Sequence, residues 1–262
     1  MRRTHYKPHR IKPKKSIFKK LVFWLVFLLS FLIVGGIYFF IFFETFQISK
    51  IIILGNEKVQ TKELENLVSE GVKQKLWFVN FQNILLVSPA KINQSILKQY
   101  PNINSIETKR KLPNVLVINI KERKPSAIFC NKTDCFFIDE NGVVFEKIPG
   151  VRDGFLIVRQ FEEKKIILGK EIVKKEIMEK IAKIKKDLKE KFQINVKEAI
   201  ISSEERLDIK TSENWEIYFN LVIDIDLQIE KLNLLLEKEI PKESRAGLKY
   251  IDLRFKDRAY YK

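Results

Sequence analysis

The sequence predicts an α+β protein that a single N-terminal transmembrane helix attaches to a membrane. Three observations support this fold class: an uninterrupted apolar run, then strand and helix patterns in the order β-α-α-β-β, then repeated strands with two longer amphipathic helices. We divide the chain into a basic cytoplasmic tail (1–20), a transmembrane helix (21–43), a small β-α-α-β-β domain (44–122) and a mostly antiparallel β domain (123–262).

The positive charge of the chain is concentrated at its N-terminus. The formal net charge is +16, and residues 1–20 hold nine of the 49 Lys and Arg residues and no acidic residue. The remaining 40 basic residues are balanced by 33 acidic ones, so the rest of the chain is only mildly basic. A basic run beside a membrane helix sets topology and contacts anionic lipids, and this tail shows no recognition fold. We therefore expect no nucleic acid partner.

Residues 21–43 contain no charged side chain. As a helix they span about 34 Å, against a hydrocarbon core of about 30 Å. A cleaved signal peptide is the alternative, but its apolar stretch is shorter and ends in a small-x-small cleavage site. Because the positive charges lie before the helix, we expect a cytoplasmic N-terminus and a single pass through the inner (cytoplasmic) membrane. Everything after residue 44 is then exported.

The segment after the membrane helix reads as two short helices between strands. The first strand ends in a Gly-Asn turn, and Gly71 is expected to end the first helix. Ser88 is the expected N-cap of the second helix, because Pro89 after it suits the first helical position. We expect strands at 46–56, 103–111 and 115–123, helices that begin at Thr61 and Pro89, and an apolar patch at 76–80.

The later part of the chain reads as repeated strands with two longer helices. The sequence Asp-Glu-Asn-Gly at 139–142 signals a hairpin turn, and Pro241 stops the second helix. We expect strands at 136–138, 143–145, 157–158, 166–168, 196–203, 206–211 and 215–220, helices at 172–192 and 225–241, and a closing strand within 250–262.

The two cysteines flank a turn-prone segment of four residues. Cys130 and Cys135 lie in an oxidising compartment if the chain is exported as predicted. In a hairpin they would face each other, which permits a disulfide, and two buried free thiols are the alternative. The spacing is not the Cys-x-x-Cys of a redox catalyst.

Catalytic constellations are missing from the exported sequence. Both histidines, His5 and His9, lie in the basic tail, so no Ser-His-Asp triad, Cys-His pair or histidine zinc site can form outside. No phosphate-binding or dinucleotide-binding glycine motif occurs. The acidic pairs at 139–140 and at 224 and 226 suit a turn and a helix N-terminus. We therefore expect no enzyme activity, no metal and no cofactor.

The last thirteen residues alternate apolar and charged side chains. Ile251, Leu253 and Phe255 are expected to face the core, and Asp252, Arg254 and Lys256 the other side. A terminal strand often lies at a sheet edge, where it either recruits another chain or is blunted by its charges. The residues alone leave both alternatives open.

Several segments together resemble the FtsQ/DivIB family of cell-division proteins. They are FQISKIIILGNEKVQTKEL, LWFVN, KLPNVLVINIKERKPSA with Glu122, Arg123, Pro125 and Ala127, FFIDENGVVF and YIDLRF. The resemblance implies a POTRA domain followed by a β domain, in a non-enzymatic scaffold of the bacterial divisome at the septum. A POTRA-bearing accessory of a transport or secretion system is the alternative, and an anchored carboxylate hydrolase is a third.

The resemblance also implies partners and a site. Members of the family bind FtsB-like and FtsL-like single-pass proteins outside the membrane, among other divisome proteins. A segment of the FtsB-like partner adds a strand beside the C-terminal strand. Carried over to this chain, the partner-binding residues are Arg254, Phe255, Lys256, Asp257, Arg258, Ala259 and Tyr260. Backbone hydrogen bonds would give affinity and alternate side chains would set the register.

Overall fold

A computed structural model describes residues 17–76, 79–162 and 165–262. The expectations for the basic tail up to residue 16, and for Trp77 and Phe78 of the apolar patch, lie outside the described residues. The chain forms two compact units: α1 and the segment 72–88 belong to one, and the strands and helices after residue 118 belong to the other.

The first element is the predicted apolar helix. Helix α1 spans Ile17–Phe42, and its stretch Lys20–Phe42 is long and apolar enough to cross a membrane. The large side chains of this stretch are almost all exposed, as a lipid-facing helix requires. A short 3₁₀ turn, η1, follows at Glu44–Phe46.

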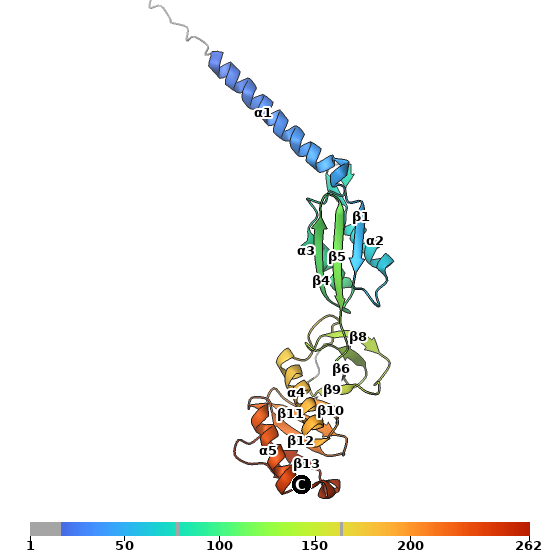
Figure 1. Ribbon diagram of the computed structural model, residues 1–262, viewed down its shortest axis with the longest axis vertical. Coiled ribbons are helices and arrows are strands. Elements are labelled where there is room, and N and C mark those ends of the chain that lie inside the picture. Colours follow the sequence, from blue (N-terminus) through green and yellow to red (C-terminus); the bar gives the residue numbers. More distant parts are fainter. Residues whose placement is uncertain (1–16, 77–78, 163–164) are drawn as a thin grey trace, which may run out of the picture. The chain divides into compact units, whose positions relative to one another are not determined.

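The β-α-α-β-β order is confirmed, with one extra hairpin. The three long strands form a sheet in the order β1-β5-β4, in which β5 is central (Figure 1). A two-stranded hairpin lies between the helices, where the sequence indicated only an apolar patch. The elements are β1 (Lys50–Leu54), α2 (Thr61–Val72), β2 (Gln74–Leu76), β3 (Val79–Phe81), α3 (Pro89–Gln99), β4 (Ile103–Lys111) and β5 (Val115–Glu122).

Local chemistry explains most of these boundaries. Gly55 has φ of +83°, and a Cβ there would come within 2.2 Å of the Ile120 carbonyl oxygen, so the turn after β1 needs glycine. The carboxylate of Glu122 accepts the backbone N–H groups of residues 57–59. Helix α2 ends at Val72, one residue after the expected Gly71, and Val72 is fully buried.

The later part of the chain forms one nine-stranded sheet in the order β14-β13-β12-β11-β10-β9-β6-β7-β8. Five neighbouring pairs are antiparallel and three are parallel, so the mostly antiparallel prediction is confirmed. The strands are β6 (Ala127–Cys130), β7 (Cys135–Ile138), β8 (Val144–Ile148), β9 (Leu156–Gln160), β10 (Val196–Ile201), β11 (Arg206–Thr211), β12 (Glu216–Asn220), β13 (Tyr250–Asp252) and β14 (Tyr260–Tyr261).

Two helices pack on one face of the large sheet (Figure 1). Helix α4 (Lys175–Phe192) buries Met178, Ile181, Ile184 and Leu188, at the spacing of one helical face. Helix α5 (Ile225–Lys238) begins after Asp224, whose carboxylate accepts the Asp226 N–H at 2.9 Å, and a short 3₁₀ turn, η2 (Lys242–Gly247), follows it. The helices and the inward strand residues form one core, in which Trp215 and Phe219 are the largest fully buried side chains.

The expected strand at 166–168 is wrong. Gly169 takes φ of +82°, and its N–H donates to the carbonyl of Val144 at 2.7 Å, while the Lys170 N–H donates back to Ile167. This turn closes the segment into a loop, and Ile167 is half exposed. An apolar run of three residues therefore did not suffice to predict a strand.

The closing segment departs most from the expectation. The alternation holds for Ile251 and Leu253, which are both fully buried, but Phe255 is 45% exposed and does not face the core. The chain turns after Leu253 because the ammonium of Lys231 binds the carbonyl oxygens of Leu253 and Phe255. It then returns as β14, which pairs antiparallel with β13.

Candidate partner-binding edge and the polar face beside it

Strand β14 forms one end of the nine-stranded sheet. Next to it, the N–H of Lys262 donates to the carbonyl of Tyr250 at 3.2 Å, and the N–H of Tyr250 donates to the carbonyl of Lys262 at 3.3 Å. In an antiparallel ladder the bonding direction alternates, so the N–H and C=O of Tyr261 point away from β13. Within residues 17–76, 79–162 and 165–262 no strand pairs on that side. The sheet therefore ends in an open edge made by the chain's own C-terminal segment.

The seven residues expected to bind a partner surround this edge, and most of them are exposed. The rings of Phe255 and Tyr260 meet edge to face with centroids 5.3 Å apart, and Arg258 donates to the Tyr260 hydroxyl at 3.4 Å. Arg254 and Ala259 are half-buried, and Phe255, Lys256, Asp257, Arg258 and Tyr260 are exposed. The structure thus brings an aromatic pair and cationic side chains together at the turn between β13 and β14.

Arg254 is held by an internal partner. Its Nε and one Nη lie 2.9 and 2.6 Å from the two carboxylate oxygens of Asp252, a bidentate pair. Burial alone would raise the pKa of Asp252, but the hydrogen bonds and charge of Arg254 outweigh it and hold that pKa below its usual range. The same hydrogen bonds raise the pKa of Arg254. Arg254 therefore fixes the turn after β13 as well as facing the candidate site.

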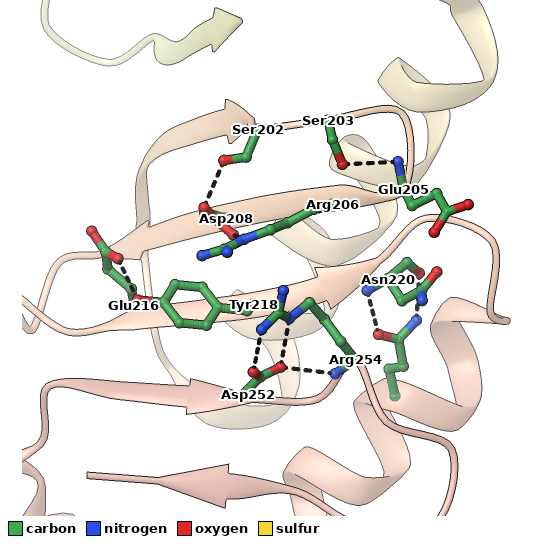
Figure 2. Close-up of polar contacts among 11 residues, drawn as sticks. Ser202, Ser203, Glu205, Arg206, Asp208, Glu216, Tyr218, Asn220, Asp252 and Arg254 are labelled. Atoms are coloured by element: carbon green, nitrogen blue, oxygen red, sulfur yellow. Dashed lines mark hydrogen bonds and ion pairs between the residues drawn. The ribbon is translucent and has the colours of Figure 1, made fainter. Parts of the chain in front are cut away.

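The neighbouring strands carry a polar network on the face opposite the helices (Figure 2). Asp208, almost fully buried, accepts hydrogen bonds from the Ser202 hydroxyl and from the Arg206 Nε, both at 2.7 Å. The Arg206 guanidinium lies 4.5 Å from the centroid of the Tyr218 ring, in cation–π geometry. Arg206 thus links a carboxylate on its own strand to an aromatic ring on the next.

Tyr218 is the centre of this network. Its hydroxyl donates to Glu216 at 3.0 Å, and its ring stacks on Tyr250 with centroids 5.4 Å apart. Burial, together with the hydrogen bond to the anionic Glu216, raises the pKa of Tyr218 to about 12. The guanidinium of Arg254 lies 5.7 Å from the same ring, so one aromatic platform spans from β11 to β13.

This network was not predicted from the sequence. Its signal was present, because Arg206, Asp208, Glu216 and Tyr218 occupy the outward positions of two predicted strands. The pairing register, which places Asp208 opposite Tyr218, was needed to connect them.

The carboxylates weighed as catalytic candidates have structural partners. Asp139 accepts the N–H groups of Asn141 and Val143 in the hairpin turn and pairs with Arg123. Asp224 caps α5. Across the described residues no cluster of three His, Cys, Asp or Glu side chains could hold a metal ion. Asp139 and Asp224 are therefore engaged in structural contacts of the fold.

The cysteines lie directly opposite each other in the β6–β7 hairpin. Cys130 pairs with Cys135 in the strand register, and their sulfur atoms are joined in a disulfide with an S–S distance of 2.00 Å. Asn131 accepts the N–H groups of Thr133 and Asp134 in the intervening turn. The bridge closes the hairpin and is remote in sequence from the C-terminal edge.

Comparison with protein families accounts for both folded regions. Residues 46–123 match the POTRA domain of FtsQ type, and residues 127–254 match the C-terminal domain of the cell division protein FtsQ/DivIB. The chain belongs to the FtsQ/DivIB family. The resemblance inferred from the sequence motifs is thereby confirmed, and the chain is a non-enzymatic cell-division protein.

Two similar proteins are also named as cell-division proteins. "Cell division protein DivIB" of Clostridium botulinum (strain Hall) is 29% identical over 257 residues, which cover 94% of this chain and 91% of the relative. "Cell division protein DivIB" of Clostridium tetani is 28% identical over 206 residues, or 76% of this chain and 75% of the relative. The FtsQ/DivIB domain match ends at Arg254, so the aromatic turn and β14 lie beyond the matched range.

Proposed function

We propose that this FtsQ/DivIB protein is a membrane-anchored scaffold of the divisome that presents its POTRA and β domains outside the cytoplasmic membrane at the septum. The family membership and the apolar helix α1 support this proposal. The nine basic residues before the helix support a cytoplasmic N-terminus. The proposed domain limits are 1–20, 21–43, 44–122 and 123–262.

The partner we propose is an extended segment of an FtsB-like single-pass protein, in a complex that also holds an FtsL-like protein. It adds a strand to the outer side of β14. The observation that carries this proposal is the open edge, where the N–H and C=O of Tyr261 point away from the sheet. Strand addition uses such groups for affinity.

The side chains around the edge favour a particular partner chemistry. Phe255 and Tyr260 form an exposed aromatic pair, which suits an apolar residue of the added strand. Lys256 and Arg258 are exposed at the same turn. Charge complementarity then favours an acidic partner segment and helps to fix its register. The added segment should therefore alternate acidic and apolar side chains.

Site-specific photocrosslinking in living cells tests this proposal. A benzophenone side chain replaces Phe255 or Tyr260 in the full chain, and the crosslinked products are identified by mass spectrometry. Phe161 provides the matched control, because it is an aromatic residue that is 82% exposed after β9, outside the proposed site. We expect adducts to small single-pass coiled-coil proteins from positions 255 and 260 and none from 161.

A second variant separates backbone from side-chain contacts. Tyr261→Pro removes an N–H that points away from β13, so it should leave the β13–β14 pairing intact and weaken the crosslink at 255. Unchanged crosslinking in Tyr261→Pro would exclude strand addition at this edge. Equal adducts from position 161 would show that the labelling is not specific to the site.

A topology assay tests the orientation. Alkaline phosphatase fused after Lys262 is active only when it is exported, and a fluorescent protein at the N-terminus reports the position in the cell. An active fusion and fluorescence at midcell are expected. An inactive C-terminal fusion would reverse the proposed orientation.

A further inference from the structure

The end of the membrane helix is joined to the folded chain by side-chain hydrogen bonds. The last carbonyl groups of a helix have no partner within it. Here the side-chain amide of Asn83 donates to the carbonyl oxygens of Phe40 and Ile41 at 2.7 and 2.9 Å, and Gln47 donates to Ile41 at 2.9 Å. Asn83 is only 1% exposed. A buried residue of a distant loop thus caps α1.

Backbone hydrogen bonds fix the same loop to the segment that follows α1. The N–H of Ile48 donates to the carbonyl of Gln82, and the N–H of Ile84 donates to the carbonyl of Phe46, both at 2.9 Å. The N–H of Gln82 also donates to the Gln47 side chain at 2.8 Å. The segment 72–88 and α1 belong to one compact unit, so the position of the loop relative to the helix is defined.

Two leucines of this loop lie along the membrane helix. Leu85 and Leu86 are 40% and 51% exposed, although they are large apolar side chains. Together with α1 they line an apolar groove of about 400 Å³, whose helix residues include Leu32, Ile33, Gly36 and Ile37. A side chain at Gly36 would have no atom within 4 Å, so the groove is open there.

The depth of these helix residues places the groove within the bilayer. Gly36 lies six residues before the end of α1, which corresponds to about 9 Å along the axis at about 1.5 Å per residue. The apolar stretch Lys20–Phe42 is about as long as the hydrocarbon core is thick, so its last residue lies close to the core boundary. Side chains that pack beside Gly36 therefore lie among acyl chains.

We propose that Leu85 and Leu86 insert into the acyl region of the leaflet that surrounds the C-terminal half of α1. The protein then contacts the bilayer at two places, the helix and a loop of the POTRA domain, and Asn83 is the positioning residue that holds the loop at this depth. Lipid explains why two leucines stay exposed on a folded domain, since acyl chains cover them. The inference does not depend on the proposed partner.

Fluorescence in vesicles tests this proposal. The two native cysteines are joined in a disulfide, so a single cysteine at Leu86→Cys can be labelled with NBD in the full chain. The chain is reconstituted at low protein density in vesicles of phosphatidylglycerol and phosphatidylethanolamine, with and without doxyl-labelled lipid. Leu227→Cys is the matched control, because Leu227 is a leucine, 54% exposed, on α5 of the other compact unit.

The expected result is a blue-shifted NBD emission at position 86 and quenching by doxyl lipid about twofold stronger than at 227. Asn83→Ala should reduce the quenching at 86, because it releases the loop from the helix end. Emission and quenching equal to those at 227 would overturn the proposal. A blue shift without quenching would also overturn it, because the groove would then hold a second copy of the chain. Leu85→Cys repeats the measurement at an independent position.

Discussion

The two faces of the nine-stranded sheet are stabilised in different ways, although alternate residues of the same strands supply both. On the face under α4 and α5, the inward residues of β11 to β13 are buried and, apart from Thr211, hydrophobic. On the opposite face, the same strands present Arg206, Asp208, Tyr218 and Asp252, which satisfy one another by hydrogen bonds and ring contacts.

The difference between the faces shows how a sheet can leave one face uncovered by helices. Hydrophobic burial is non-directional and needs a covering layer, which the helices supply. Paired charges and aromatic rings need no covering layer, because each polar group already has a partner on a neighbouring residue or strand. The face opposite the helices (the open face) should therefore contribute less to stability than the face under α4 and α5 (the covered face). Its contribution to stability should also depend more on pH. Four predictions test this difference.

The largest effect is expected on the covered face. Phe219→Ala should lower the free energy of unfolding by about 3–5 kcal/mol, because it removes a fully buried aromatic side chain and leaves a cavity. Denaturant unfolding of the detergent-solubilised protein measures this loss. Leu234→Ala is the control, since Leu234 on α5 is 52% exposed and its truncation should change stability by less than about 0.5 kcal/mol. Equal losses in the two variants would contradict the assignment of the core.

A smaller effect is expected from the ion pair on the open face. Asp252→Ala leaves the half-buried Arg254 without its bidentate partner and should cost about 1–3 kcal/mol in the same unfolding measurement. Asp252→Asn keeps one acceptor and should lower the free energy of unfolding by less than Asp252→Ala. A loss as large as that of Phe219→Ala would show that the open face is as important for stability as the core.

The Tyr218 hydroxyl should contribute less to stability than the Asp252–Arg254 pair. Tyr218→Phe keeps the ring contacts and removes only the hydrogen bond to Glu216, so we expect a loss of about 0.5–1.5 kcal/mol at neutral pH. Because the folded-state pKa is about 12 and the unfolded one about 10, this contribution is present below pH 10 and lost as the pH rises through 12. Spectrophotometric titration should show a tyrosine that ionises near pH 12 in the wild type and is missing in the variant.

The smallest effect on stability is expected at acidic pH. The pKa of Asp252 is held below its usual range in the folded protein, so its contribution to stability is present above the unfolded pKa of about 3.9 and lost as the pH falls through the folded value. The stability difference between the wild type and Asp252→Asn should therefore shrink below about pH 4. Unfolding curves recorded between neutral and acidic pH provide the measurement. If the stability difference between the two proteins stays constant with pH, Asp252 does not make the stability of the open face depend on pH.

The covered face could be predicted from the sequence, and the open face could not. Ile217, Phe219, Ile251 and Leu253 follow the period of two that places buried residues on one side. The contacts of Arg206 with Tyr218 depend on the pairing of two strands, which periodicity does not define.

The turn at the candidate site was also beyond sequence reasoning. Alternation continued through Phe255, so the sequence predicted one straight strand. The structure turns there because Lys231, on a helix more than twenty residues earlier, binds two carbonyl oxygens of the turn. Such a contact has no local signal. Residue types at the site were therefore predicted, and their arrangement was not.

The hydrogen bonds of Asn83 to the end of α1 also have a mechanical consequence. A helix capped in this way cannot rotate about its own axis without carrying the attached loop with it. Each residue of an α-helix turns by about 100° relative to the one before it. Inserting one residue into the membrane span would therefore turn the attached segment by about 100° relative to the part of the helix before the insertion. The length of α1 thus sets which face of the helix lies on the same side as the attached loop, as well as the depth of that loop.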